Sequence, residues 1–322
     1  MVDGLSAKEI FEAQARIAPV TLHTPLLPSS ALSNRDGRSV YLKLETLQET
    51  GTFKVRGAAN KILSLPEAQR ARGVVTASTG NHGRAVSHVA RELGIPAVVC
   101  ISERVPQNKV EALRQSGAEL VIEGNGQDEA AERAFALQEE RGLTMVHPFD
   151  DPLVIAGQGT IGLEMLDEAP ELDTVLVPLS GGGLISGVAL ALKSAALELR
   201  VIGVSMEHSP VMYHSLQAGR PVQMPEEETL ADSLLGGIGL ENRYTFDLVR
   251  QLVDDVILVT EEEIARAMAF LLREQRLVVE GAGAVGVAAL LAGKVPDPGR
   301  NVGVVISGGN VALDALLRIA QA

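Results

Sequence analysis

Four short segments of the chain hold residues that could bind and activate a small molecule. They contain a lysine, an asparagine–histidine pair, a glycine-rich loop and a serine–glycine–glycine turn, and they are Gly51–Ala58, Ala77–Gly83, Ser180–Leu184 and Ser307–Asn310. We interpret them as loops at strand ends, because apolar runs precede most of them. Ligands of open α/β sheets bind beyond the carboxyl ends of the strands, so we expect these segments to form one site.

The glycine-rich loop Ser180–Gly183 has the form of an anion-binding turn. It follows the apolar run Thr174–Val177 and opens the helical stretch Leu184–Ser194. Glycines let the backbone approach a ligand closely, and the free N–H groups at a helix start favour an anion such as a phosphate. The pattern alone is equally consistent with a tight turn that binds nothing.

Each of the other candidates also has an ordinary structural interpretation. A lone lysine such as Lys54 is usually a solvated surface charge. Ser78 and Asn81 could cap a helix. His82 could be a hydrogen-bonded structural histidine, and Ser307 could belong to a turn after a buried strand. The combination of these residues, and no single one, points to chemistry.

The elements between these segments alternate between apolar runs and amphipathic helical stretches. The runs include Val74–Ala77, Ala97–Ile101, Thr174–Val177, Val201–Val204, Val256–Val259 and Val302–Ile306. Strands that alternate with helices predict an α/β fold with parallel sheets covered by helices. A length of 322 residues fits two domains. No Pro/Gly/Ser-rich linker divides the chain, so we expect two interleaved domains.

Composition and charge narrow the class of partner. The formal net charge of -13 argues against nucleic acid or an anionic membrane, which both require a basic face. No run approaches the roughly 18 apolar residues of a membrane span. Residues 1–17 lack the pattern of a signal peptide, so we expect a cytoplasmic protein. The single cysteine, Cys100, lies in an apolar run and is expected to be a buried hydrophobic residue.

A competing interpretation rests on Gly281–Gly286, which matches the dinucleotide fingerprint G-x-G-x-x-G. The fingerprint requires a preceding strand, and a lone match is a weak signal. The stretch before it, 261–276, has a helical pattern, and only Leu277–Val279 could form a strand. A helix whose small residues pack against a neighbour explains the glycines better. A catalytically silent binding module is a third interpretation, and the presence of Lys54 argues against it.

In this order and at these spacings, the four segments resemble the type II fold of pyridoxal-phosphate enzymes, and within it the threonine dehydratase and serine racemase family. Further matching segments are His23–Pro25, His147–Pro152 and Ala156–Thr160. The closest similarity that we find is to hydroxyectoine-utilisation dehydratases. The shared segments are Ser78–Gly83, Leu179–Gly183 and Ala231–Ser233.

The resemblance implies pyridoxal 5'-phosphate as the cofactor and Lys54 as the catalytic residue whose amine bonds to the cofactor aldehyde. Such a lysine must lose its proton to act, so its pKa should be lowered by desolvation. The implied cofactor-binding residues are Phe53, Lys54, Asn81, Ser180, Gly181, Gly182, Gly183, Leu184, Glu280 and Ser307. The implied substrate-binding residues are Ser78, Thr79, Asn81 and His82.

Within this set, the resemblance assigns a part of the cofactor to each group. The loop 180–183 would hold the phosphate, and Asn81 would approach the ring hydroxyl. Ser307 would face the pyridine nitrogen, where a neutral hydroxyl does not keep the nitrogen protonated as a carboxylate would. Ser180 replaces a glycine of serine racemase-like relatives, and we expect its hydroxyl to add a phosphate donor. Thr52 is expected to cap the helix that starts at Lys54.

The implied activity is dehydration of a small hydroxy-amino acid to a 2-oxo acid and ammonia. The substrate would be similar to threonine or serine, or derived from hydroxyectoine. An amino-acid racemase on the same scaffold is the alternative, and it needs a second acid/base on the cofactor face opposite Lys54. Serine racemase uses a serine at the position of Thr79. The β-branch of Thr79 restricts χ1 and its side chain is a good helix cap, so we expect elimination to dominate.

The resemblance also carries expectations about organisation. It implies a large cofactor-binding domain from 1–72 and 151–322, a small mobile domain from 73–150, and a homodimer. The chain ends soon after Asn310, so we expect no C-terminal regulatory domain and no inhibition by isoleucine. Serine racemase-like relatives bind a divalent cation where this chain has Ser205 and Val211. Valine supplies no oxygen ligand, so we expect no metal there unless Glu207 replaces the lost ligand.

Overall fold

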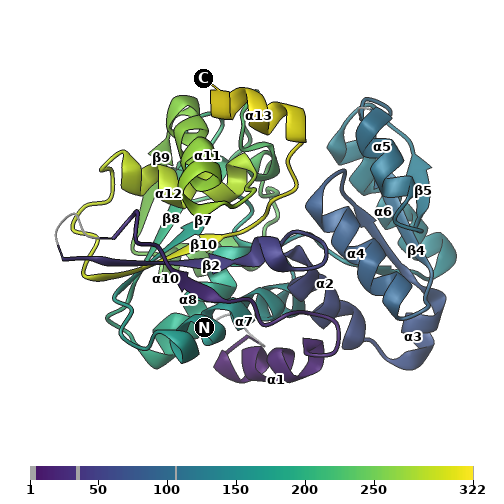
Figure 1. Ribbon diagram of the computed structural model, residues 1–322. Helices are drawn as coiled ribbons and strands as arrows, with labels where there is room; N and C mark the ends of the chain where they lie inside the picture. The colour runs from purple at the N-terminus through teal and green to yellow at the C-terminus, as the bar shows by residue number, and fades with distance from the viewer. Residues whose placement is uncertain (1–4, 34–36, 106, 322) are drawn as a thin grey trace.

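The computed structural model describes residues 5–33, 37–105 and 107–321, whose strands form two sheets (Figure 1). The larger sheet has the strand order β1-β2-β10-β7-β8-β9 and the smaller one β5-β4-β3-β6. The larger sheet contains β1 (Leu26–Pro28), β2 (Ser39–Leu44), β7 (Thr174–Pro178), β8 (Arg200–Met206), β9 (Asp255–Val259) and β10 (Asn301–Ile306). The smaller sheet contains β3 (Val74–Ala77), β4 (Ala97–Ile101), β5 (Glu119–Ile122) and β6 (Thr144–Met145).

All strand pairs run parallel in the described part of the chain, except the pair of β1 with β2. The predicted α/β class with parallel sheets is therefore confirmed. The smaller sheet comes from one continuous stretch, whereas the larger sheet combines strands from both ends of the chain. This is the interleaving expected from the missing linker. The domain boundaries themselves, 1–72 with 151–322 and 73–150, remain a prediction.

Helices cover both sheets. They are α1 (Ala7–Ile17), α2 (Lys54–Leu63), α3 (Glu67–Arg72), α4 (Asn81–Glu92), α5 (Gln107–Arg114), α6 (Gln127–Arg141), α7 (Pro152–Glu168), α8 (Gly183–Ala195), α9 (Val211–Ala218), α10 (Thr245–Leu252), α11 (Glu261–Gln275), α12 (Gly281–Leu291) and α13 (Leu313–Gln321), with the short 3-10 turns η1 (Glu45–Leu47) and η2 (Asp232–Leu234). A capping box of Thr260 and Glu263 opens α11.

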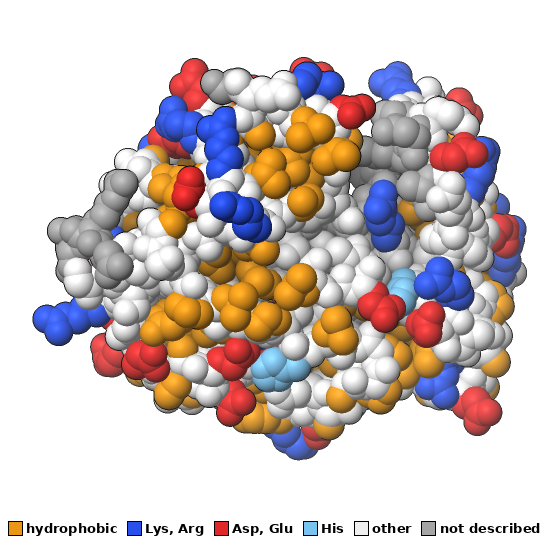
Figure 2. Space-filling model, viewed as in Figure 1, with side chains coloured by type: hydrophobic (Ala, Val, Ile, Leu, Met, Phe, Trp, Pro, Cys, Tyr) orange, Lys and Arg blue, Asp and Glu red, His pale blue; other side chains and the backbone are white. Residues whose placement is uncertain are grey.

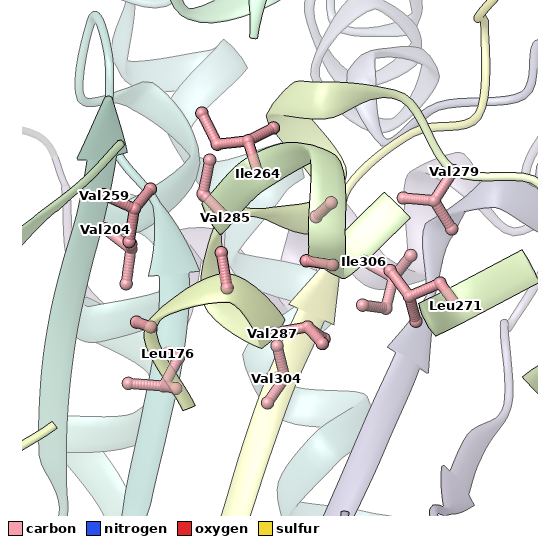
Figure 3. Close-up of a cluster of buried hydrophobic side chains, with 14 of the residues drawn as sticks. Leu176, Val204, Val259, Ile264, Leu271, Val279, Val285, Val287, Val304 and Ile306 are labelled. Atoms are coloured by element: carbon pink, nitrogen blue, oxygen red, sulfur yellow. The ribbon is translucent and has the colours of Figure 1, made fainter. Parts of the chain in front are cut away.

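The core of the larger sheet lies in two layers. On one face, α11 and α12 bury aliphatic side chains against the strands, and Figure 3 shows Val287 of α12 beside Val304 of β10. On the other face, α7, α8 and α10 pack against residues that include Val175 and Val305. Both faces of the parallel sheet are therefore buried, which explains its nearly continuous apolar strands.

Helix α2 joins the two halves of the molecule. Its Ala58, Ala59 and Ile62 pack against α4 of the smaller sheet. Its opposite side meets α7, where a Cβ on Gly157 would lie 2.6 Å from the carbonyl oxygen of Arg56 and 2.7 Å from the Cα of Gly57. Only glycines allow this close contact of backbones. The helix that begins at Lys54 is therefore held from both sides.

The surface between the two halves is hollowed (Figure 2). A cavity of about 450 Å³ lies there, between residues 46–51 and one face of α4. Arg84, His88 and Arg91 line it on the α4 side, and Asn310 also lines it. In the described residues, no helix is long and apolar enough to cross a membrane.

Candidate active site

The segments singled out in the sequence meet where β10, β7 and β3 end. The isolated bridge between Thr52 and Gly308 ties the segment before α2 to the end of β10. The backbone N–H of Phe53 donates to the carbonyl of Ser307 at 3.0 Å. Residues that lie more than 250 positions apart in the sequence are thus neighbours, as the parallel-sheet argument predicts.

Lys54 is the first residue of α2, and its amine points into the protein. Nζ donates to the carbonyl of Pro148 at 2.8 Å and lies 5.2 Å from the centre of the Phe53 ring. Burial lowers the pKa of Lys54 to about 8, against the opposing effect of the Glu280 carboxylate. The predicted desolvated lysine is present. The predicted cap is wrong, because the Thr52 hydroxyl donates to the carbonyl of Ser307 at 3.2 Å and leaves α2 uncapped.

The glycine-rich loop forms an open anion-binding turn. Gly182 has a φ of 87°, and no side chain caps the start of α8 at Gly183. A Cβ on Gly181 would lie 2.5 Å from the Phe149 ring, and one on Gly183 would lie 2.9 Å from the Phe149 backbone. Glycine is therefore required, and the first N–H groups of α8 remain free for a ligand.

The hydroxyl of Ser180 does not point to a ligand as we expected. Its hydroxyl donates to the carbonyl of Leu234 at 2.8 Å, so its hydrogen is already used within the protein. The expected extra donor to phosphate is wrong for the hydroxyl, because a single O–H hydrogen cannot serve both acceptors.

Asn81 links the half with the smaller sheet to the half with the larger sheet. It starts α4, and its Nδ2 donates to Glu280 Oε1 at 2.8 Å and to Ser233 Oγ at 3.3 Å. Its Oδ1 accepts from Asn310 Nδ2 at 2.7 Å. Gly80 is the N-cap residue, and no side chain caps this helix. The capping interpretation of Ser78, Asn81 and Thr79 is therefore wrong. The Ser78 hydroxyl instead accepts from the backbone N–H of Gly80 at 3.4 Å.

Sequence reasoning assigned no role to Ser233 and Asn310. Both belong to segments that it quoted, Ala231–Ser233 and Ser307–Asn310. Their contact with Asn81 depends on how the two sheets are placed, which no local pattern encodes. Ser307 itself is buried at the end of β10, with its carbonyl turned to Phe53 and Thr52.

Glu280 is a buried carboxyl at the start of α12. Burial, together with the nearby charge of Asp232, raises the pKa of Glu280 to about 7, against the opposing effect of hydrogen bonds from Asn81 and Ser233. A carboxyl that is half protonated near neutral pH is typical of functional sites. The expectation that Glu280 lies near the site agrees with its contact to Asn81.

His82 is buried beside Lys54. Its Nε2 donates to the carbonyl of Val146 at 2.9 Å, and Nδ1 has no hydrogen-bond partner in the described residues. Burial lowers the pKa of His82 to about 3, and the positive charge of Lys54 acts in the same direction. The imidazole is therefore neutral at physiological pH.

This burial predicts acid sensitivity of the fold. The unfolded histidine has a pKa of about 6.5 and the folded one about 3, so the stabilisation present above pH 6.5 is lost as pH falls. As pH falls from roughly 6 to 4, the free energy of unfolding of His82→Gln should rise relative to that of the parent protein by about 1.4 kcal/mol per pH unit. Glutamine does not titrate, and its amide can donate to Val146. Urea unfolding at several pH values measures this, and parallel slopes for the two proteins would contradict the assignment.

No cluster of three or more metal-binding side chains occurs in the described residues. Ser205 is buried in β8, and Val211 opens α9. Glu207, the one replacement ligand that we considered, lies 3.4 Å from the amine of Lys294 and is paired with it. Val211 supplies no oxygen ligand, and the absence of a cation at this place remains a prediction.

We expect activity to be unchanged by a chelator such as EDTA. The measurement is the rate of 2-oxo acid release before and after dialysis against chelator. A loss of activity that magnesium restores would show that another group of residues binds a cation.

The residues fit pyridoxal phosphate. The free N–H groups at the start of α8 suit its phosphate, and the Lys54 amine with its lowered pKa suits its aldehyde. Asn81, from the half with the smaller sheet, and Glu280, at the start of α12, supply further polar groups.

Comparison with known proteins agrees with this fit. Residues 17–308 match the family model described as "Pyridoxal-phosphate dependent enzyme". The chain belongs to this family. A putative threonine dehydratase of Sinorhizobium fredii is 49% identical over 310 residues, which cover 96% of this chain and 93% of the relative. An L-threonine ammonia-lyase of Thermotoga maritima is 47% identical over 98% of this chain and 78% of the relative.

The solved structure of maize serine racemase superposes on this fold with a TM-score of 0.91, at 38% identity, covering 98% of this chain and 96% of that one. Together with the relatives, this makes the chain a pyridoxal-phosphate-dependent lyase with the type II fold. The dinucleotide interpretation of Gly281–Gly286 has no support, because this segment lies within α12 and its glycines pack against Leu230, Gly308 and Val304.

Proposed function

We propose that this lyase removes the hydroxyl group of a small β-hydroxy amino acid, similar to threonine or serine, and releases a 2-oxo acid and ammonia. The observation that carries the proposal is the Lys54 amine, which lies inside the protein with a pKa of about 8, beside Asn81, Glu280 and the open start of α8. The relatives named threonine dehydratase and threonine ammonia-lyase support the reaction class.

When bound, pyridoxal phosphate supplies an electron sink that makes the Cα–H bond of an amino acid acidic. Lys54 would hold the cofactor through its amine, and the free amine would remove the Cα proton of the substrate. A pKa near 8 leaves a sizeable neutral fraction of this amine at physiological pH, which a general base requires. The Pro148 carbonyl, at 2.8 Å, keeps the freed amine in place.

The other residues would hold and orient the cofactor. The backbone N–H groups of Ser180, Gly181, Gly182, Gly183 and Leu184 would bind the phosphate, and Phe53 packs beside the Lys54 amine. Ser307 would face the ring nitrogen with a neutral hydroxyl, and Asn81, which contacts Glu280, would lie with it at the ring hydroxyl.

The start of α4 binds the substrate. The N–H groups of Ser78, Thr79, Asn81 and His82 lie around the uncapped beginning of this helix, and such groups favour a carboxylate. Residues 73–150 form a small domain that closes over the substrate and excludes water. The protein works as a homodimer in the cytoplasm. A hydroxyectoine-derived amino acid is the alternative substrate, supported by the shared segments 78–83 and 231–233.

The test is a screen for 2-oxo acid and ammonia release from hydroxy-amino acids. The panel contains L-threonine, L-serine, 3-hydroxyaspartate and the hydroxyectoine-derived amino acid. At least one of them should give both products in equal amounts. Absence of both products from every member of the panel would contradict the dehydratase reaction.

Racemisation is the second candidate, because maize serine racemase has the same fold and 38% identity. We expect D-serine to form from L-serine in deuterated water at least about 10-fold more slowly than pyruvate, a difference of ~1.4 kcal/mol in barrier height. The half-buried Thr79 has a restricted χ1, so its hydroxyl is poorly placed to deliver a proton. Deuterated D-serine that appears as fast as pyruvate would show that Thr79 acts as a second base.

A further inference from the structure

We propose that Asn310 is a positioning residue that fixes which end of the Asn81 side-chain amide faces the cofactor ring. The inference rests on the proposed function, since it takes Asn81 as the partner of the ring hydroxyl. The carboxamide of Asn81 has a donor end and an acceptor end, and only the donor end stabilises a negatively charged ring oxygen.

The orientation of Asn310 is set by two acceptors. Its Nδ2 donates to the backbone carbonyl of Thr50 at 2.9 Å and to Oδ1 of Asn81 at 2.7 Å. A reversed Asn310 amide would place its oxygen against two oxygens, so the reversed state is disfavoured. A Cβ on Gly51 would lie 2.7 Å from Oδ1 of Asn310, so glycine at this position leaves room for that side chain.

The turn that carries Asn310 is itself held. Gly309 N–H donates to the carbonyl of Gly51 at 2.9 Å, and the Gly308 carbonyl accepts from the N–H of Glu280 at 3.1 Å. A Cβ on Gly308 would lie 2.8 Å from Glu280 Oε1. The backbone of the turn after β10 is therefore held in place, and the side chain of Asn310 contacts Asn81 at the start of α4, which covers the smaller sheet.

This arrangement leaves one orientation for Asn81. Its Oδ1 is occupied by Asn310, and its Nδ2 is turned to Glu280 at 2.8 Å and Ser233 at 3.3 Å. The contact to Ser233 is long for an N–H···O hydrogen bond, so we expect this N–H of Asn81 to turn from Ser233 to a ring oxygen when the cofactor is bound. Asn310 thus turns the donor end of the Asn81 amide toward the cofactor ring. Glu280 favours the same orientation, because it accepts a hydrogen bond from that donor end.

The experiment compares Asn310→Asp and Asn310→Ala with the parent enzyme, all loaded with pyridoxal phosphate. The aspartate accepts and does not donate, so it favours the reversed Asn81 amide, whereas alanine only removes the constraint. We expect about 10-fold weaker affinity for pyridoxal phosphate in the aspartate variant, the loss of about one hydrogen bond. The absorbance band of the bound cofactor should shift in both variants and more in the aspartate variant. Asn301→Asp, which adds the same charge at the other end of β10, should leave affinity and spectrum unchanged.

A double-mutant cycle with Asn81→Ala tests whether Asn310 acts through Asn81. In the Asn81→Ala background, Asn310→Ala should change neither affinity nor spectrum further. Full additivity of the two substitutions, or an unchanged spectrum in Asn310→Ala, would overturn the inference. Borohydride labelling of Lys54 in every variant separates the two proposals. An unlabelled Lys54 in the parent enzyme would overturn the proposed function, whereas labelled variants with unchanged spectra would overturn only the role of Asn310.

Discussion

Replacing Lys54 by alanine is expected to lower kcat/KM for 2-oxo acid release by about 10²–10⁴-fold, the range in which a positioned general base contributes. The alanine variant lacks both the amine that holds the cofactor and the base that removes the Cα proton. The fold should tolerate the change, because α2 is held through Ala58, Ala59 and Ile62 on one side and Gly57 on the other.

Lys61 provides the matched control for this experiment. It lies on the same helix and forms an ion pair with Asp151 at 2.6 Å, away from the proposed site. Lys61→Ala should keep kcat/KM near the parent value, with at most a small loss of stability. The rate of 2-oxo acid release at saturating pyridoxal phosphate is the measurement. Equal rates for the Lys54→Ala and Lys61→Ala variants would remove Lys54 from the mechanism.

The second large effect is expected from Arg56, which is fully buried two residues after Lys54. Its guanidinium contacts Glu45 Oε1 at 2.8 Å and Glu164 Oε1 at 2.6 Å. Burial alone would raise the pKa of Glu45, but the charge and hydrogen bond of Arg56, together with Thr24 and Lys43, outweigh it and hold that pKa below its usual value. Lys43 adds a second cation, 2.8 Å from Glu164 and 3.1 Å from Glu168. These charges link η1, β2, α2 and α7.

We expect Arg56→Met to lower the free energy of unfolding by about 3–5 kcal/mol, since it leaves buried carboxylates without their partner. Urea unfolding at pH 7 measures this value. The control is Arg250→Ala, which removes an exposed pair with Asp247 and should cost about 0–1 kcal/mol. A loss below about 1 kcal/mol for Arg56→Met would mean that the buried carboxylates find other partners or take up protons.

The sequence predicted the strand-end loops and their meeting point well. Ser180–Gly183 and Ser307 follow strands whose apolar pattern is strong, and parallel strands bring their carboxyl ends to one edge. The burial of the Lys54 amine followed from the resemblance and agrees with its lowered pKa.

Most of the wrong predictions concern hydroxyl groups. Thr52 and Ser180 have good local patterns for capping and phosphate binding, yet their hydroxyls donate to the carbonyls of Ser307 and Leu234. Those acceptors are distant in sequence, so the choice between a local and a distant partner cannot be made from a local pattern. The same reason explains why the contacts of Arg56 and Asn310 were not foreseen, although both residues lie in quoted segments.

The most direct test of the account is borohydride reduction of the enzyme loaded with pyridoxal phosphate, followed by peptide mapping. Reduction fixes the cofactor to the amine that holds it, so the modified peptide identifies the carrier. We expect a single modified lysine, Lys54, in the peptide that includes Gly51–Phe53. Modification of a different lysine, or no modification of any lysine, would contradict the assignment of Lys54 as the residue that carries the cofactor.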